Sequence, residues 1–162
     1  YFTDSSFWGL DNGPQGLIIR NSTVTHYLSD AFSSSYLILN SSADDQDGMG
    51  TGAHPDIVQW YGHYENVIVQ GLTSSNAPDS QGLFQGGDPS VQTLKDIAVI
   101  DCDLDHGTTI ARVFLFLSTS NHFIVKDSNF VGPTQVGGSI SDFVISGTTF
   151  SDAPLNPGIL FQ

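Results

Sequence analysis

The chain has 162 residues, enough for a single domain with a sizeable core, and carries a formal net charge of −13 with only 4 Lys and Arg residues. Nucleic acids and anionic membranes are bound through clustered cations, so this charge excludes both as partners. No run of about 18 apolar residues is present, so we expect no membrane insertion. The acidity fits a secreted, extracellular protein. Without an initiator Met or a signal peptide, the chain is expected to be a mature product or a piece of a longer one.

The composition predicts an all-β fold. Helix-forming residues are scarce, Val, Ile, Phe and Thr are plentiful, and the 17 Gly residues supply turns. The single cysteine, Cys102, has no partner for an internal disulfide and lies in an apolar run, so we expect it in the core.

Residues 1–16 are rich in aromatic and turn-forming residues. We expect them to form an N-terminal capping segment that lays Phe2, Phe7 and Trp8 over one end of the core. The remaining residues, 17–162, are expected to form the repeated coils of the same single domain.

A repeat begins after this segment. Each copy starts with a β-prone triplet whose first and third residues share one face, and the copies start at Leu17, Leu37, Val67, Ile97, Phe123 and Phe143. Four copies bring back an apolar residue seven positions later, at Val24, Leu104, Phe130 and Phe150.

A second short β-type run follows in each repeat, as in Asp56–Tyr61 and Gly82–Gln85. Short strands at a period of about 20 to 30 residues predict a solenoid, here a right-handed parallel β-helix of about six coils. The alternative is an antiparallel sandwich or jelly roll. Extra residues are expected to leave as loops at Ser42–Ala53, Ser74–Gln81 and Gly86–Leu94.

The chain ends in a strand-like run, Gly158–Gln162. A solenoid hides its last edge under a cap. We therefore expect an open or truncated C-terminal end, covered by a continuation of the parent chain or by a partner, as in a homo-oligomer such as a trimer.

One stretch resembles secreted bacterial parallel β-helix proteins with pectate-lyase-like architecture. It holds His54, Pro55, Asp56 and Gln59, followed by an Asn-Val-Ile-Val run at 66–69. The resemblance implies extracellular polysaccharide work, since lyases, hydrolases, epimerases, tailspikes and adhesins share this architecture. It implies no specific catalytic family. The polygalacturonase signature is absent apart from a faint echo at Asp103–Gly107, and no pectate-lyase Arg adjoins a calcium carboxylate cluster.

The densest chemistry lies in the same stretch. His54 and Asp56 could act as acid and base in a polysaccharide lyase or glycoside hydrolase, while Trp60, Tyr61 and His63 could contact sugar. The alternative is a set that fixes a turn by bonding to loop backbone.

The orientation of Asp56 follows from an alignment of two strands. Residues 56–59 aligned with 82–85 pair Ile57 with Leu83 in the core. Asp56 would then point outward and Gln59 inward, where Gln59 could stack with Gln85.

Two acidic runs offer further candidates. Asp44, Asp45 and Asp47 precede glycines and could bind calcium, although the same residues could form a solvated acidic loop. Asp105 and His106 close a run of alternating carboxylates and could contact substrate, although polar residues are ordinary at such a corner.

The sequence thus predicts an extracellular β-helix that processes or binds a polysaccharide on its loop side. An anionic glycan would be repelled unless a metal bridged it. The alternative is a non-catalytic structural, adhesin or fibre segment.

Overall fold

The computed structural model describes residues 1–8, 18–47, 55–77, 80–86, 92–106, 112–116, 120–136, 140–151 and 160–161. Within these ranges all regular structure is β-strand, and no helix could cross a membrane. Every strand pairing is parallel.

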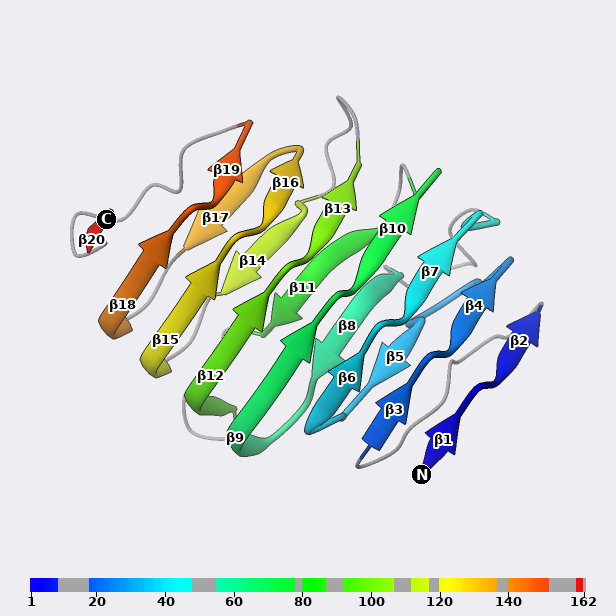
Figure 1. Ribbon diagram of the computed structural model, residues 1–162, viewed down its shortest axis with the longest axis horizontal. Coiled ribbons are helices and arrows are strands. Elements are labelled where there is room, and N and C mark those ends of the chain that lie inside the picture. The colour runs from blue at the N-terminus through cyan, green and yellow to red at the C-terminus, as the bar shows by residue number, and fades with distance from the viewer. Residues whose placement is uncertain are drawn as a thin grey trace.

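The strands form three sheets (Figure 1). The eight strands of the first sheet are, in order, β1 (Phe2–Thr3), β3 (Ile18–Arg20), β6 (Leu37–Leu39), β9 (His63–Gln70), β12 (Thr93–Ile100), β15 (Ser120–Lys126), β18 (Ile140–Ser146) and β20 (Leu160–Phe161). The seven strands of the second sheet are β2 (Ser6–Trp8), β4 (Thr23–Thr25), β7 (Ser42–Asp44), β10 (Thr73–Ser75), β13 (Asp103–Asp105), β16 (Asn129–Val131) and β19 (Thr149–Phe150). The five strands of the third sheet are β5 (Phe32–Ser33), β8 (Asp56–Trp60), β11 (Gln81–Gln85), β14 (Phe114–Phe116) and β17 (Thr134–Val136).

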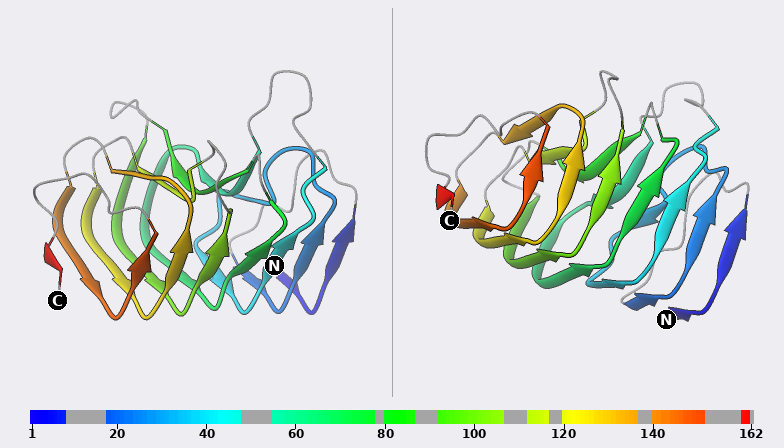
Figure 2. Two further views of the ribbon diagram at one scale, coloured as in Figure 1. Left: turned by 90° about the horizontal axis from the view of Figure 1, so that it is seen from above. Right: turned by 45° about the horizontal axis from the view of Figure 1, so that its top comes forward.

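The chain visits the sheets in turn, so each strand pairs with the equivalent strands of the coils before and after it. In Figure 2 the first and second sheets meet in a row of V-shaped turns, and the third sheet lies across from them. This arrangement is a parallel β-helix, as predicted, and it excludes the antiparallel sandwich.

The first eight residues of the N-terminal segment already contribute strands to the β-helix. Among the described residues, seven coils place a strand in both the first and the second sheet, against the expected total of about six. Strands β1 and β2 pair with β3 and β4. Phe2 and Phe7 pack edge to face, with ring centroids 5.4 Å apart, and lie against the core as expected. Trp8 does not, since 73% of its surface is exposed.

The predicted core rows are confirmed over most of the chain. Along the first sheet, Val67, Ile97, Phe123 and Phe143 align in register and are buried. Along the second sheet, Leu104, Phe130 and Phe150 align in the same way. Val24 is also buried and belongs to the same row, two coils before Ser74, which is the residue that pairs with Leu104. Cys102 is also buried in this core, which raises the pKa of its thiol to about 11.

One core triplet is a residue out of phase with the prediction. Ile38, rather than Leu37 and Leu39, is fully buried, and it pairs with Ile19 on one side and Val69 on the other. Two expected loops also begin later than predicted, because Ser42–Asp44 and Thr73–Ser75 are strands of the second sheet. Thr93 and Leu94 belong to β12, while residues 48–54, 78–79 and 87–91 lie outside the described ranges.

The turn between the first and second sheets repeats in every coil. Its corner residue has positive φ in seven coils, where only Asp, Asn and Gly occur: Asp4, Asn21, Asn40, Gly71, Asp101, Asp127 and Gly147. These are the residue types that tolerate the left-handed region. The corner amides continue the ladder from coil to coil, as in the bond from Asn40 N to Gln70 O at 2.8 Å.

We predict that Gly71→Ala destabilises the fold by about 1–2 kcal/mol, the cost of a Cβ in the left-handed region. Gly71 has a φ of 65°, and an added Cβ would lie 2.7 Å from Asn40 Oδ1. Urea unfolding measures the change. The control, Asn40→Gly, should cost less, because glycine suits its φ of 45°. Equal stability of Gly71→Ala and wild type would contradict this account of the corner.

Candidate functional site

A buried acidic cluster lies where the third sheet begins. Asp30 precedes β5, whose pairing with β8 aligns Ser33 with Gln59, and the Ala31 amide donates to Asp56 O at 2.7 Å. This pairing brings Asp30 and Asp56 together from positions 26 residues apart in the sequence. Both carboxylates are buried, with 6% and 0% of their residue surface exposed.

Gln59 joins the two carboxylates to Tyr61. In the orientation that satisfies both ends of its amide, the nitrogen donates to Asp30 Oδ2 at 2.8 Å and to Asp56 Oδ2 at 2.9 Å. Its oxygen accepts from the Tyr61 hydroxyl at 2.6 Å. Ser33 Oγ adds a further donor to Asp30 at 3.0 Å. Hydrogen bonds from these donors offset part of the cost of burying the carboxylates.

Tyr61 connects the cluster to the surface. Burial of its hydroxyl end, followed by the charges of Asp30 and Asp56, raises the pKa of Tyr61, so the phenol remains a neutral donor at physiological pH. The rest of the side chain is open, since 55% of the residue is exposed. An aromatic ring fixed at its hydroxyl and free on its face is suited to stacking against a planar or apolar ligand surface.

The predicted outward orientation of Asp56 is wrong. The register pairs Val58, not Ile57, with Leu83, and it pairs Gln59 with Phe84 rather than with Gln85. Ile57 lies in the core as predicted, but every residue of β8 is buried, Asp56 included. The expected outward side does not face solvent, because both faces of this strand are covered.

The other residues of this stretch that were expected to contact sugar differ in their exposure to solvent. Trp60 is 0% exposed and its indole Nε1 donates to Ser35 O at 3.0 Å, so the expected sugar contact is replaced by a core position. His63 is exposed and its Nδ1 lies 2.8 Å from Thr93 Oγ1 in the next coil. His54 lies outside the described residues.

Asp105 and His106 occupy different environments. Asp105 is exposed on β13 of the second sheet, whereas His106 is 2% exposed. Burial lowers the pKa of His106 to about 4, so the imidazole is neutral at physiological pH. His106 is therefore an interior residue, which corrects the expectation that it contacts substrate.

The three acids predicted to bind calcium each have a different neighbour. Asp44 Oδ1 accepts from Ser75 Oγ at 2.7 Å, Asp45 Oδ1 accepts from Asn76 Nδ2 at 2.8 Å, and Asp47 Oδ1 lies 2.9 Å from His26 Nδ1. Within the part of the chain that the structure describes, no three His, Cys, Asp or Glu side chains are grouped to hold a metal ion.

Sequence reasoning missed two residues. Asp30 follows no local motif, and only the pairing of β5 with β8 places it beside Asp56. Trp8 was expected in the core, but its exposed indole packs on the His26 ring with centroids 5.3 Å apart. Its position directly after Phe7 in the three-residue strand Ser6–Trp8 was a usable signal, because Phe7 takes the inward position and leaves its neighbour outward.

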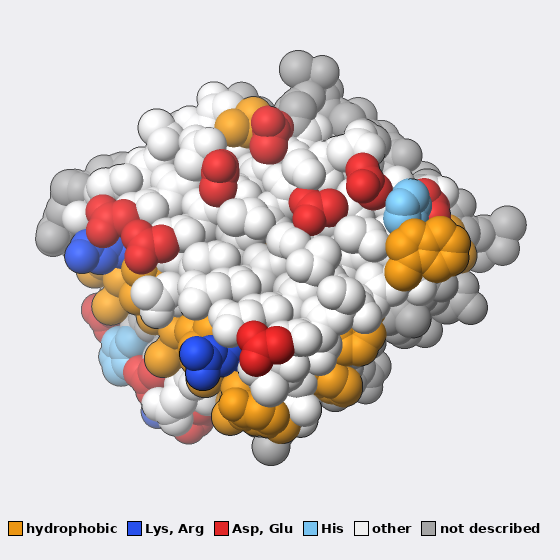
Figure 3. All heavy atoms as spheres, turned by 45° about the vertical axis from the view of Figure 1, so that its right-hand side comes forward, with side chains coloured by type: hydrophobic (Ala, Val, Ile, Leu, Met, Phe, Trp, Pro, Cys, Tyr) orange, Lys and Arg blue, Asp and Glu red, His pale blue; other side chains and the backbone are white. Residues whose placement is uncertain are grey.

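A shallow uncharged groove lies at the corner between the first and second sheets. Its volume is about 400 Å³, and hydroxyl, amide and glycine residues line it: Asn21, Thr23, Asn40, Ser41, Ser42, Gly71 and Thr73. Figure 3 shows a largely polar face of the molecule, on which acidic side chains are scattered, a few basic side chains lie beside them, and apolar side chains lie mainly toward the edges.

Comparison with known proteins assigns no relative. No protein-family profile matches the sequence, and no curated protein matches it significantly.

We predict that His106 makes the fold sensitive to acid. Its pKa is about 4 in the folded chain and 6.5 in the reference state, so the unfolded chain binds a proton first as the pH falls. Above about pH 6.5 the imidazole is neutral in both states, so His106 has no effect on the pH dependence of stability. Between about pH 7.5 and about pH 5, protonation of His106 in the unfolded chain should lower the free energy of unfolding by about 2 kcal/mol. Urea unfolding at both pH values, in wild type and His106→Gln, measures this part of the loss. An equal loss in both proteins would contradict it.

Proposed function

We propose that the chain is an extracellular carbohydrate-active β-helix protein that binds or processes a polysaccharide, with Tyr61 as its main contact. The observation that carries the proposal is the arrangement of Tyr61, whose exposed ring is held at its hydroxyl by Gln59 and the buried pair Asp30 and Asp56. A preorganised aromatic ring suits the apolar face of a sugar, because little side-chain entropy is lost on binding.

The charge of the chain favours a neutral polysaccharide. With a net charge of −13, long-range repulsion opposes a uronate-rich or sulfated glycan. The neutral hydroxyl groups of such a glycan match the donors and acceptors of the corner groove, which include Asn21, Asn40 and Thr73.

Binding fits the geometry better than turnover does. A general acid must reach the glycosidic oxygen, whereas Asp56 is fully buried and meets the surface through Gln59 and Tyr61. The two carboxylates thus support the position of Tyr61. Hydrolysis or elimination would require one of them to be uncovered by substrate.

A structural role is the second candidate, favoured by the polar contacts between coils. Asn129 Nδ2 donates to Asp103 Oδ1 at 2.9 Å, and Ser42 Oγ donates to Thr23 Oγ1 at 3.2 Å. Such bonds between equivalent positions stiffen a rod without any ligand. A spacer would show neither glycan binding nor product.

We predict that Tyr61→Ala weakens binding to a neutral polysaccharide by at least about tenfold, the effect of about 1.4 kcal/mol of lost contact. A panel of neutral and anionic polysaccharides, each with calcium and with chelator, identifies the ligand by affinity electrophoresis. Reducing-end and unsaturated-sugar assays on the same samples detect hydrolysis or elimination.

The matched control is Tyr1→Ala, because Tyr1 is also an exposed tyrosine, at 73%. It should bind like wild type, and Tyr61→Phe should fall between wild type and Tyr61→Ala because it keeps the ring and loses the anchor. Unchanged binding in Tyr61→Ala, or no binding to any glycan, would contradict the proposal.

A further inference from the structure

The outer face of the first sheet carries an unbroken aliphatic row. Strand pairing aligns one outward residue from each of six successive coils, and all six are aliphatic: Ile18, Leu37, Ile68, Ala98, Ile124 and Val144. Ile68 and Ile124 are 40% and 45% exposed, although their neighbours in sequence, Val67 and Val125, are buried in the core. The row therefore faces water rather than the interior.

The second sheet shows that the fold does not require such a row. One outward row of this sheet is polar throughout: Thr23, Ser42, Thr73, Asp103, Asn129 and Thr149. A contiguous exposed apolar row on one sheet, beside a polar row on the next, is typical of an interaction surface.

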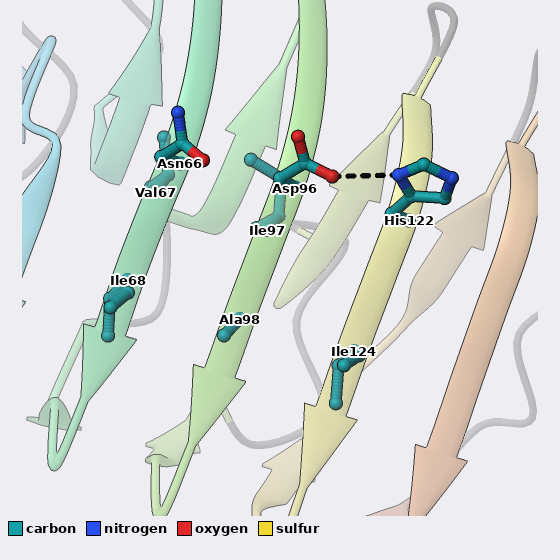
Figure 4. Close-up of a pocket in the computed structure, with 8 residues that line it drawn as sticks. All are labelled: Asn66, Val67, Ile68, Asp96, Ile97, Ala98, His122 and Ile124. Atoms are coloured by element: carbon teal, nitrogen blue, oxygen red, sulfur yellow. Dashed lines mark hydrogen bonds and ion pairs between the residues drawn. The ribbon is translucent and has the colours of Figure 1, made fainter.

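Ala98 makes a hollow in this row. Its side chain lies between those of Ile68 and Ile124 on the neighbouring strands (Figure 4). The resulting hollow has a volume of about 330 Å³, and its polar wall is formed by Asn66, Asp96 and His122. His122 Nδ1 lies 2.7 Å from Asp96 Oδ1 along this wall. A large side chain on one strand thus stands directly beside a space on the next.

The same face holds most of the positive charge of the chain. Arg20, Lys95 and Lys126 lie on its strands, and the whole chain has 4 Lys and Arg residues. They accompany the acids Glu65, Asp96 and Asp142. The strands of this face carry as many cations as acids in a chain of net charge −13, so two copies that meet on it experience little net repulsion there.

We propose that the occupant of this face is a second copy of the chain, packed sheet to sheet about a two-fold axis that runs parallel to the strands between β12 and β15. This symmetry keeps positions along the strands and reverses the order of the coils. Ile124 then enters the hollow above the partner's Ala98, and the partner's Ile124 enters the hollow above Ala98. Ile68 faces the partner's Val144. An isologous interface with one knob and one hollow on each copy is self-complementary.

The polar side of the row is also complementary under this symmetry. Asp96 faces the partner's His122, and His122 faces the partner's Asp96. Asn66 faces the partner's Asp142, while Lys126 faces the partner's Ile100. No acid of this wall faces an acid, and no lysine faces a lysine. The interface lies on the first sheet, so it leaves the Tyr61 side of the third sheet free, and it does not depend on the proposed function.

Exchange of knob and hollow tests the proposal. Ala98→Ile fills the hollow, so two large side chains would oppose each other at each contact, and we expect the dimer to weaken by at least about tenfold. Ile124→Ala removes the knob and should also weaken the dimer by about tenfold. The double variant Ala98→Ile/Ile124→Ala moves the knob to the other strand and should recover most of the wild-type affinity.

Sedimentation equilibrium over a wide concentration range measures these affinities, and far-ultraviolet circular dichroism checks that each variant is folded. Both substituted side chains face solvent in the single chain, so folding should not change. The expected result is a wild-type dimer, two weakened single variants and a recovered double variant. A monomeric wild type at every concentration would overturn the proposal. Tighter association of Ala98→Ile would also overturn it, since that is the behaviour of a non-specific apolar patch or of a surface that serves another partner.

Discussion

The in-register parallel pairing of successive coils is the constraint on which the rest of the structure depends. Each coil donates and accepts its backbone hydrogen bonds at the same positions as its neighbours, so residues 16 to 31 apart in the sequence become neighbours about 4.8 Å apart. This pairing requires a corner that can be repeated, and a residue in the left-handed region supplies it in seven coils. Rows of equivalent side chains follow directly, on the inside and on the outside.

The distinctive sites of the molecule lie where one residue of a row differs in type from the equivalent residues of the neighbouring coils. Gly71 interrupts the Asp and Asn residues of the corner row, and the Asn40 side chain lies where a Cβ of residue 71 would be. Ala98 interrupts the aliphatic row between two isoleucines and creates a hollow. Asp30 and Asp56 place two buried carboxylates beside each other at the third sheet, and Gln59 connects them to Tyr61 by hydrogen bonds. A solenoid built of uniform rows would have none of these features.

The fold could be predicted because its period is visible in the apolar triplets, and the core rows from Val67 onward follow from it. The phase at Leu37 could not be read from the triplets, since Leu37, Ile38 and Leu39 are all apolar. The corner residue would have settled it: four residues separate Val67 from Gly71, but only three separate Leu37 from Asn40. A sequence alignment anchored on the corner therefore gives the observed register.

The candidate site was predictable only in part. Asp56 and Tyr61 were found from the density of polar residues, and the structure joins them through Gln59. Their relative burial could not be predicted, because β8 is buried on both faces and an alternating pattern assumes one exposed face. Matching Gln59 with Gln85 also placed the strand one residue out of register. Asp30 belongs to the preceding coil and carries no motif, so its role depends on a long-range pairing that the local sequence does not encode.

Distances along one outward row test the stacking most directly. Spin labels can be placed at Thr23 and, in turn, at Asp103, Asn129 or Thr149, in a Cys102→Ser background that matches the serine at this position in the next coil, Ser128. Coils stacked in parallel predict separations of about 14, 19 and 24 Å before allowance for label length, rising by one coil spacing each time. Distances that do not increase in this order would contradict the parallel stack.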